Sequence, residues 1–287
     1  SRGLGDVYKR QHMVLRVGHI PILYVPYVRF PIGDERLSGF LFPGIGVSDN
    51  HGTEISIPYY WNIAPHMDAT ITPHNMTRRG LMLETEFRYL TQNARGAFDI
   101  NYLPDDKVYG EDRERFTWTH LGTARAGWSS AVNYNYASDV DYLDDFSGSL
   151  TTASITHLER RGNLNYNHPR FLFSAQLQDY QNISGTQPYK QLPQLRFDTR
   201  LAHLDNQWNY DLVSEYVRYD HRDADRLIGD RLMLSPYLSY PVQAAAGFIV
   251  PRLTVKHLQY ELDQIAPGQS ESPGVTVPVF SLDTGIF

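Results

Sequence analysis

Histidines and carboxylates near the start of the chain are the first candidates for chemistry. Glu54, His66, Asp68 and His74 are residue types that bind metal ions. Their spacing matches no known ligand pattern, and His66 and His74 lie at opposite ends of one predicted strand, too far apart to share an ion. We therefore expect no metal site here, and no other cofactor.

Paired aspartates are the second candidates, because neighbouring carboxylates can act as acid and base. They lie in polar segments typical of solvated loops, and no Ser/His/Asp arrangement accompanies them. The chain is therefore not expected to be an enzyme. The pairs are Asp105 with Asp106, Asp144 with Asp145, and Asp223 with Asp225.

Composition excludes further classes of function. The chain has 287 residues, a net charge of −6 and no cysteine, so it offers neither a disulfide nor the basic surface that nucleic acids require. Aromatic residues make up 13% of the chain, yet its mean hydropathy is −0.42. This combination is typical of strands with one apolar and one wet face.

Alternation with a period of two residues runs through most of the chain. Residues 97–102 place Phe98, Ile100 and Tyr102 on one face of a predicted strand, and residues 131–136 repeat the pattern. We expect about 12 antiparallel strands after residue 40, roughly 8–14 residues long, which suits a tilted strand crossing a bilayer. No apolar run is long enough for a transmembrane helix.

Connections of two sizes and the position of prolines suggest how the chain is organised. Short turns alternate with long polar stretches, as in a membrane barrel with turns at one end and loops at the other. Residues 1–11 read as a non-native or disordered leader, and 12–37 as the end of a separate small β domain with its linker. Residues 38–287 read as barrel. The long stretches are 104–114, 138–149, 220–230 and 264–275.

Motifs in the first third of the chain resemble the LPS-assembly outer-membrane protein family, LptD (also called OstA or Imp). They occur in order and at family-like spacing, which is more specific than any single motif. Beyond residue 104 the resemblance thins, and it returns at 278–283. The motifs are Ile20–Tyr27, Ser38–Pro43, Ile57–Pro65, Met67–Pro73, Arg78–Gly80, Glu86–Leu90 and Tyr102–Pro104.

The resemblance implies a two-part protein that transports lipopolysaccharide (LPS) into the outer leaflet of a Gram-negative outer membrane. A periplasmic β-jellyroll would receive LPS from a bridge protein, and a large barrel, plugged by the lipoprotein LptE, would release it. The chain would be an internal fragment: residues 12–37 the end of the jellyroll, and 38–287 an open, N-terminal part of the barrel. The family's cysteines are absent here.

The family resemblance also suggests which residues matter. Pro43 and Pro58 lie in or beside the first two barrel strands, where a missing N–H weakens pairing. We expect them to hold a lateral gate loose, although prolines that simply end strands would look the same. Tyr59, Tyr60 and Trp61 suit an interfacial aromatic girdle, with ordinary packing as the alternative. Candidate lumen-facing residues, which would touch LptE or sugar, are Glu84, Glu86, Arg88, Arg196 and Arg200.

Two other classes of protein stay open from the sequence. A passive porin or receptor-type outer-membrane barrel would share the strands but not the paired prolines. A soluble β-rich carbohydrate-binding protein would share the alternation but have shorter strands, of about 5–6 residues.

Overall fold

The computed structural model describes residues 7–17, 20–31, 36–124, 127–146, 155–199, 208–263, 265, 268 and 270–287, and before residue 36 it describes the backbone path alone. Strands dominate these ranges, and the one helix among them is α1 (Tyr142–Phe146). The predicted all-β, antiparallel fold class is confirmed. No described helix is long and apolar enough to cross a membrane. The chain divides into two compact units, residues 1–117 and 118–287.

The first two strands form a sheet of their own. β1 (Val7–Val17) pairs with β2 (Ile20–Pro31) in an antiparallel register that begins at Val7 and Pro31. Every strand of a two-stranded sheet is an edge, so the prolines of β2 are tolerated. β1 begins inside the segment that we expected to be a leader; residues 1–6 lie outside the described residues. The assignment of domains stays a prediction.

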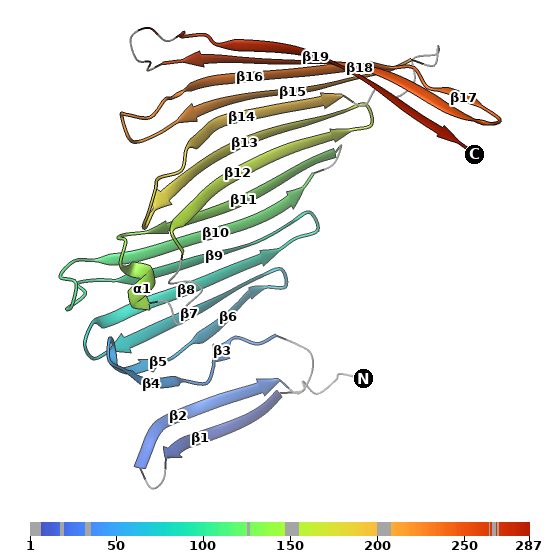
Figure 1. The fold of residues 1–287 in the computed structure, drawn as a ribbon. Coiled ribbons are helices and arrows are strands. Elements are labelled where there is room, and N and C mark those ends of the chain that lie inside the picture. Colours follow the sequence, from blue (N-terminus) through green and yellow to red (C-terminus); the bar gives the residue numbers. More distant parts are fainter. Residues whose placement is uncertain are drawn as a thin grey trace, which may run out of the picture. The chain divides into compact units, whose positions relative to one another are not determined.

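In the first unit the chain then runs up and down through neighbouring strands (Figure 1). β7 and β8 pair over their full length, from Met67 opposite Tyr89 to Met76 opposite Gly80. β10 (Arg113–Thr123) crosses the boundary between the units. The other strands are β3 (Gly39–Phe40), β4 (Gly44–Ser48), β5 (Gly52–Ser56), β6 (Tyr59–Ala64), β7 (Met67–Met76), β8 (Gly80–Leu90) and β9 (Ala94–Leu103).

The second unit repeats this arrangement with longer strands. β12 and β13 pair residue by residue from His157 opposite Asn182 to His168 opposite Phe171. Helix α1 follows β11, and its Tyr142 and Leu143 pack with Ala137 and Leu158 in a buried cluster. The strands are β11 (Trp128–Ala137), β12 (His157–His168), β13 (Phe171–Asn182), β14 (Lys190–Thr199), β15 (Asn209–Asp220), β16 (Gly229–Ser239), β17 (Val242–Ala244), β18 (Gly247–Leu262) and β19 (Gly274–Ile286).

The structure describes 17 strands from β3 to β19, more than the dozen that we expected. Interruptions by proline explain part of the difference. Pro43 separates β3 from β4, Pro58 separates β5 from β6, and Pro241 directly precedes the short β17. Each proline removes a backbone donor, so that one predicted strand becomes two short ones.

The longest connection of each unit lies at one end of its strands. In the second unit, β11–β12, β13–β14, β15–β16 and β18–β19 are all joined at the same end, because successive strands are antiparallel. In the first unit the long connection 104–112 lies at the same end as the turns 49–51 and 77–79. We call this end of each unit the loop end and the opposite one the turn end.

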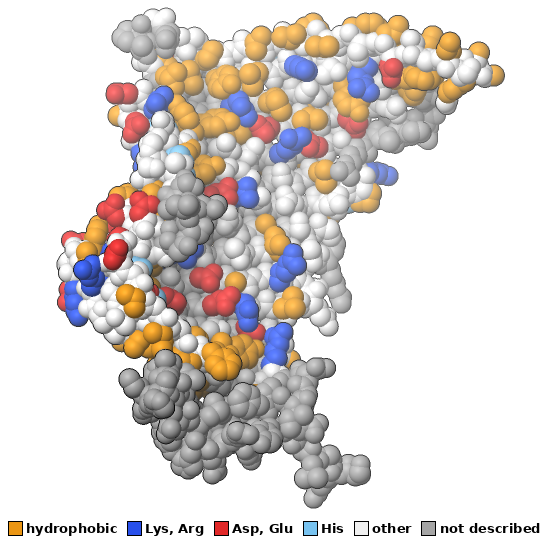
Figure 2. All heavy atoms as spheres, turned by 60° about the horizontal axis from the view of Figure 1, so that its bottom comes forward, with side chains coloured by type: hydrophobic (Ala, Val, Ile, Leu, Met, Phe, Trp, Pro, Cys, Tyr) orange, Lys and Arg blue, Asp and Glu red, His pale blue; other side chains and the backbone are white. Residues whose placement is uncertain are grey.

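From β3 onward, the sheet of each unit has one polar and one apolar face. In β8 the exposed side chains of Leu81 and Leu83 alternate with Glu84 and Glu86, as the period of two predicts. In the second unit Leu164 and Leu177 mark the apolar face. In the view of Figure 2, acidic and basic side chains lie close together in the middle of the face shown, between stretches of hydrophobic ones.

Candidate functional site

Two prolines interrupt, at one level, the backbone ladder of the hairpin formed by β3 to β6, which we call the first hairpin. β3 pairs with β6 through Gly39 and Phe40, whereas β4 pairs with β5 from Gly44 opposite Ser56 onward. Three residues, 41–43, therefore face two residues, 57–58, which is the geometry of a β-bulge. Leu41 N–H donates to Pro58 O at 2.8 Å, but Pro58 has no N–H to return the bond.

A third proline lies at the same level on the next strand. Ile57 N–H donates to Pro73 O at 3.1 Å, and Pro73 likewise has no N–H to return the bond. Each missing ladder bond lowers stability by about 1 kcal/mol. Pro73 belongs to one of the motifs that carry the family resemblance. The sequence alone does not show that Pro73 lies opposite Ile57. The weakened level therefore crosses three neighbouring strands.

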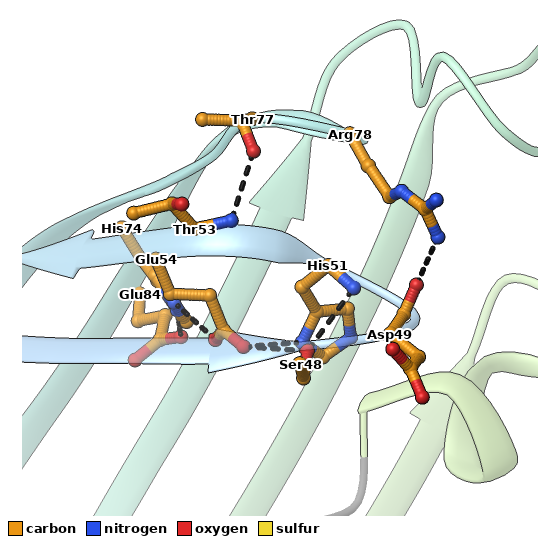
Figure 3. A network of polar contacts seen from close by, with 9 residues as sticks. All are labelled: Ser48, Asp49, His51, Thr53, Glu54, His74, Thr77, Arg78 and Glu84. Atoms are coloured by element: carbon orange, nitrogen blue, oxygen red, sulfur yellow. Dashed lines mark hydrogen bonds and ion pairs between the residues drawn. The ribbon is translucent and has the colours of Figure 1, made fainter.

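Polar side chains join the same strands on the loop-end side of the prolines (Figure 3). His74 of β7 places Nε2 3.0 Å from Glu54 Oε2 on β5 and Nδ1 2.9 Å from Glu84 Oε1 on β8. Glu54 also accepts from Ser48 Oγ at 2.8 Å and lies 3.2 Å from His51 Nδ1. We call Ser48, His51, Glu54, His74 and Glu84 the loop-end cluster.

Backbone contacts between two turns reinforce this cluster. Thr77 N–H donates to Thr53 O at 3.1 Å, and Thr53 N–H donates to Thr77 Oγ1 at 2.9 Å. Arg78 N–H donates to His51 O at 3.1 Å, and the Arg78 guanidinium reaches the carbonyl of Asp49. The loop end of the first hairpin is therefore fixed to β7 and β8.

A second cluster lies on the turn-end side, around the buried carboxylate of Asp68. Arg88 Nε donates to Asp68 Oδ1 at 2.8 Å, and Tyr60 Oη donates to Oδ2 at 3.2 Å. Arg36, in the segment before β3, lies 3.1 Å from Oδ2. Asn62 Nδ2 adds a bond to Arg36 O at 2.7 Å. We call Arg36, Tyr60, Asp68 and Arg88 the turn-end cluster; it ties the segment entering the sheet to β6, β7 and β8.

The three predicted girdle residues do not share a face. Tyr60 points to the polar face, where it contacts Asp68, whereas Tyr59 and Trp61 are on the apolar face with Ala69 and other neighbours of β7. Consecutive strand residues alternate between faces, so three in a row cannot all face lipid. An interfacial girdle therefore stays a prediction for Tyr59 and Trp61, and Trp61 is 48% exposed.

The remaining predicted residues lie on polar faces where the structure describes them. Glu84, Glu86 and Arg88 share the face of Asp68 and His74 on β7. In the second unit, Arg196 lies 2.8 Å from Asp198 and opposite Glu215 of β15, whereas Arg200 lies outside the described residues.

A hydrogen-bonded row of side chains follows the polar face of the second unit. Glu159 of β12 accepts from Asn133 and Gln178, Gln176 donates to Gln178 and Gln194, and Gln194 donates to Glu215 at 3.0 Å. Arg231 of β16 also contacts Glu215. We call this set the amide row. Most of its members are neutral, which contrasts with the charged clusters of the first unit.

The loop 104–112 is held by a buried charge cluster. Asp106 Oδ2 lies 2.7 Å from Arg79 Nη1 and 3.3 Å from Arg113 Nη1, and all three side chains are nearly inaccessible to solvent. Tyr109 stacks on the Arg113 guanidinium at 4.4 Å. Burial raises the pKa of Asp106, but the hydrogen bond from Val108 N–H and both guanidiniums outweigh it and hold this pKa below its usual range.

Residues that we considered as metal ligands are used differently in the structure. Glu54 and His74 belong to the loop-end cluster and Asp68 to the turn-end cluster, whereas His66 lies in the turn between β6 and β7. Within the described ranges, no three His, Cys, Asp or Glu side chains form a group that could hold a metal ion. The pairing register between strands brings these partners together. The spacing of the residues along the chain does not reveal this register.

An antiparallel meander with one polar and one apolar face, long strands and aromatic residues near strand ends defines the wall of an outer-membrane β-barrel. A family model described as LptD, LPS transport system D, matches residues 111–286. The chain belongs to this family. The predicted resemblance is confirmed, and the model matches the part of the chain in which our motifs thin out.

Named relatives agree with the family model. The LPS-assembly protein LptD of Alkalilimnicola ehrlichii is 38% identical over 292 residues, covering 100% of this chain and 38% of that protein. The protein of that name from Aromatoleum aromaticum is also 38% identical, covering 100% of this chain and 37% of its own length. The Shewanella frigidimarina protein is 36% identical and covers 86% of this chain. The chain thus spans less than two fifths of the first two relatives.

Proposed function

We propose that the chain is part of an outer-membrane conduit that transports LPS and inserts it into the outer leaflet through a lateral gate. Membership of the LptD family supports the substrate. The observation that carries the gate is the line of prolines across the first strands: Pro43, Pro58 and Pro73. The conduit would act by binding and guiding, and not as a catalyst.

An amphipathic lipid needs an opening in the side of the barrel. Its acyl chains must enter the bilayer while its sugars and phosphates stay in water. A pore along the barrel axis would leave the acyl chains in water. A barrel closes through pairing of its strands, and removing ladder bonds from one region makes this region the first to part. The proline line supplies such a region.

The two clusters would confine the opening. The loop-end cluster fixes one end of the first hairpin to β7 and β8, and the turn-end cluster fixes the other end and the segment before β3. Between them, residues 41–43 have few backbone bonds. In this proposal the hairpin bends at the prolines and stays attached at both ends.

The same proposal implies which molecules each part of the chain would contact. The polar face, with Glu84, Glu86, Arg88 and Arg196, would face the lumen and contact the plug lipoprotein LptE or the sugars of LPS. The hairpin of β1 and β2 would be the end of a periplasmic jellyroll that receives LPS from the bridge protein. Tyr59 and Trp61 would contact membrane lipid at the interface.

The gate is tested by restoring the missing donors. Pro43→Ala with Pro58→Ala in the full-length protein should tighten the hairpin and slow LPS delivery to the cell surface. Pro236→Ala is the matched control, because Pro236 lies within β16 opposite Leu212 in an unbroken register. Unchanged delivery in the double variant, or equal slowing in the control, would contradict the gate.

A further inference from the structure

The apolar face of the second unit ends in an aromatic cluster at the turn end. Trp128 of β11 packs on Tyr166 of β12 with ring centroids 4.8 Å apart, and Phe171 of β13 lies 5.6 Å from Tyr166. Phe197 of β14 continues the row at 5.3 Å from Phe171. Aromatic rings at this position are typical of the boundary between hydrocarbon and headgroups.

A different group lies on the same face toward the loop end. Tyr134 is directly opposite Arg160 in the register of β11 and β12. The Arg160 guanidinium lies 5.4 Å from the centroid of the Tyr134 ring and 5.6 Å from that of Tyr136. Leu164, exposed on the same face of β12, separates this group from the aromatic cluster. The apolar band of this face therefore lies between the aromatic cluster at the turn end and the group of Tyr134, Tyr136 and Arg160 toward the loop end.

The Arg160 side chain is held in place by neutral groups. Its Nε donates to Asn135 O at 3.1 Å, and its Nη2 donates to Gln181 Oε1 at 2.6 Å. Gln181 is fixed in turn, because its Nε2 donates to Ala137 O at 2.6 Å. The guanidinium is thus oriented before any ligand arrives, which lowers the entropy cost of binding.

The charge of Arg160 is not matched by a carboxylate within the described parts of the chain. Asp179 is opposite Arg160 on β13, but its Oδ1 accepts from Tyr180 N–H at 2.8 Å and the two side chains form no ion pair. Other basic residues of this face near the loop end are paired: Arg218 with Asp230 and Asp263, and Lys190 with Asp220. An unpaired arginine facing lipid is costly unless an anion meets it.

We propose that Arg160, flanked by Tyr134 and Tyr136, binds the phosphate of a lipid headgroup in the leaflet at the loop end. A guanidinium donates two parallel hydrogen bonds to a phosphate, and tyrosine rings suit the interfacial depth. The site needs the apolar face to contact lipid, but it does not depend on the lateral gate or on LPS transport.

The test compares two neighbouring arginines in the full-length protein. Arg160→Gln removes the proposed ligand, whereas Arg161→Gln is the matched control, because Arg161 is on the polar face 3.3 Å from Glu159. The barrels are placed in vesicles of phosphatidylethanolamine containing LPS, extracted, and weighed intact by mass spectrometry. We expect the lipid retained by Arg160→Gln to fall about fivefold, and that retained by Arg161→Gln to stay near wild type.

Further arms identify the ligand and check the fold. Arg160→Lys should retain an intermediate amount of lipid, because it keeps the charge but loses the planar fork. Wild-type protein should keep its lipid in excess inorganic phosphate; displacement would mean a site for free phosphate and would overturn the proposal. Equal retention by the two glutamine variants would also overturn it, provided that both migrate as folded barrels in unheated electrophoresis.

Discussion

The hairpin of β3 to β6 and the pair of β12 and β13 are held together by different means. β12 and β13 keep one register from His157 to His168, with neutral amides along their polar face. The first hairpin pairs through two short stretches on either side of the proline line. Charged clusters at both of its ends link it to β7 and β8.

This difference shows how a sheet can be locally weak without coming apart. Backbone ladder bonds cannot be removed selectively except by proline or a bulge, and both occur in the first hairpin. Partly buried charged contacts are directional and stronger than neutral hydrogen bonds, so a few of them can fix the ends of short strands. The pair of β12 and β13 keeps a continuous ladder, and its polar face carries the amide row.

The largest effect is expected at the buried charges of the first unit. Asp106→Ala leaves Arg79 and Arg113 buried without their shared carboxylate, which should destabilise the loop 104–112 and its strands by about 3–5 kcal/mol. Unfolding of the full-length barrel in denaturant would measure this. Glu111→Ala, an exposed acid of the same loop, is the control and should have little effect. A loss below about 1 kcal/mol would contradict the role of the cluster.

Acid should weaken the same loop. The pKa of Asp106 is held below its usual range, so its contribution to stability is complete above the unfolded pKa of about 3.9 and is lost as the pH falls through the folded value. Proteolysis of the loop at different pH values would follow this loss, and Asp106→Ala should remove the dependence. A transition centred well above pH 4 would point to another group.

A smaller effect is expected at the loop-end cluster. His74→Ala removes contacts to Glu54 and Glu84 and leaves the two carboxylates without their bridge, at a cost of about 1–3 kcal/mol. Asn75→Ala changes the next residue on the opposite, exposed face and serves as the control. Protease access at the turn 49–51 would report the loosening. Equal access in the two variants would show that the cluster does not hold the hairpin.

The smallest effect is expected in the second unit. Gln194→Ala interrupts the amide row between Gln176 and Glu215 but removes no backbone bond, so we expect a loss of about 0.5–1.5 kcal/mol. Denaturant unfolding can resolve this loss next to that of His74→Ala. A loss larger than that of His74→Ala would reverse the comparison between the two regions.

The sequence predicted the class of fold and the proline break better than the contacts around it. Alternation in segments such as 97–102 reports strands directly, and a proline reveals its missing donor in any context. The partners of His74 and Asp68 could not be predicted, because they depend on the register between strands. A shift of one residue would have placed His74 on the opposite face. The position of Pro73 at the level of Pro58 could not be predicted either, because it also depends on the register between strands.

The central claim is that the prolines make the first hairpin the weakest part of the wall. Hydrogen exchange of the full-length barrel in nanodiscs tests it, with peptides covering residues 39–48 and 158–168. We expect the amides of Leu41, Phe42 and Gly44 to exchange more than about tenfold faster than those of β12, and Pro43→Ala with Pro58→Ala to slow them selectively. Equal protection of the two regions, or no change in the double variant, would contradict the claim.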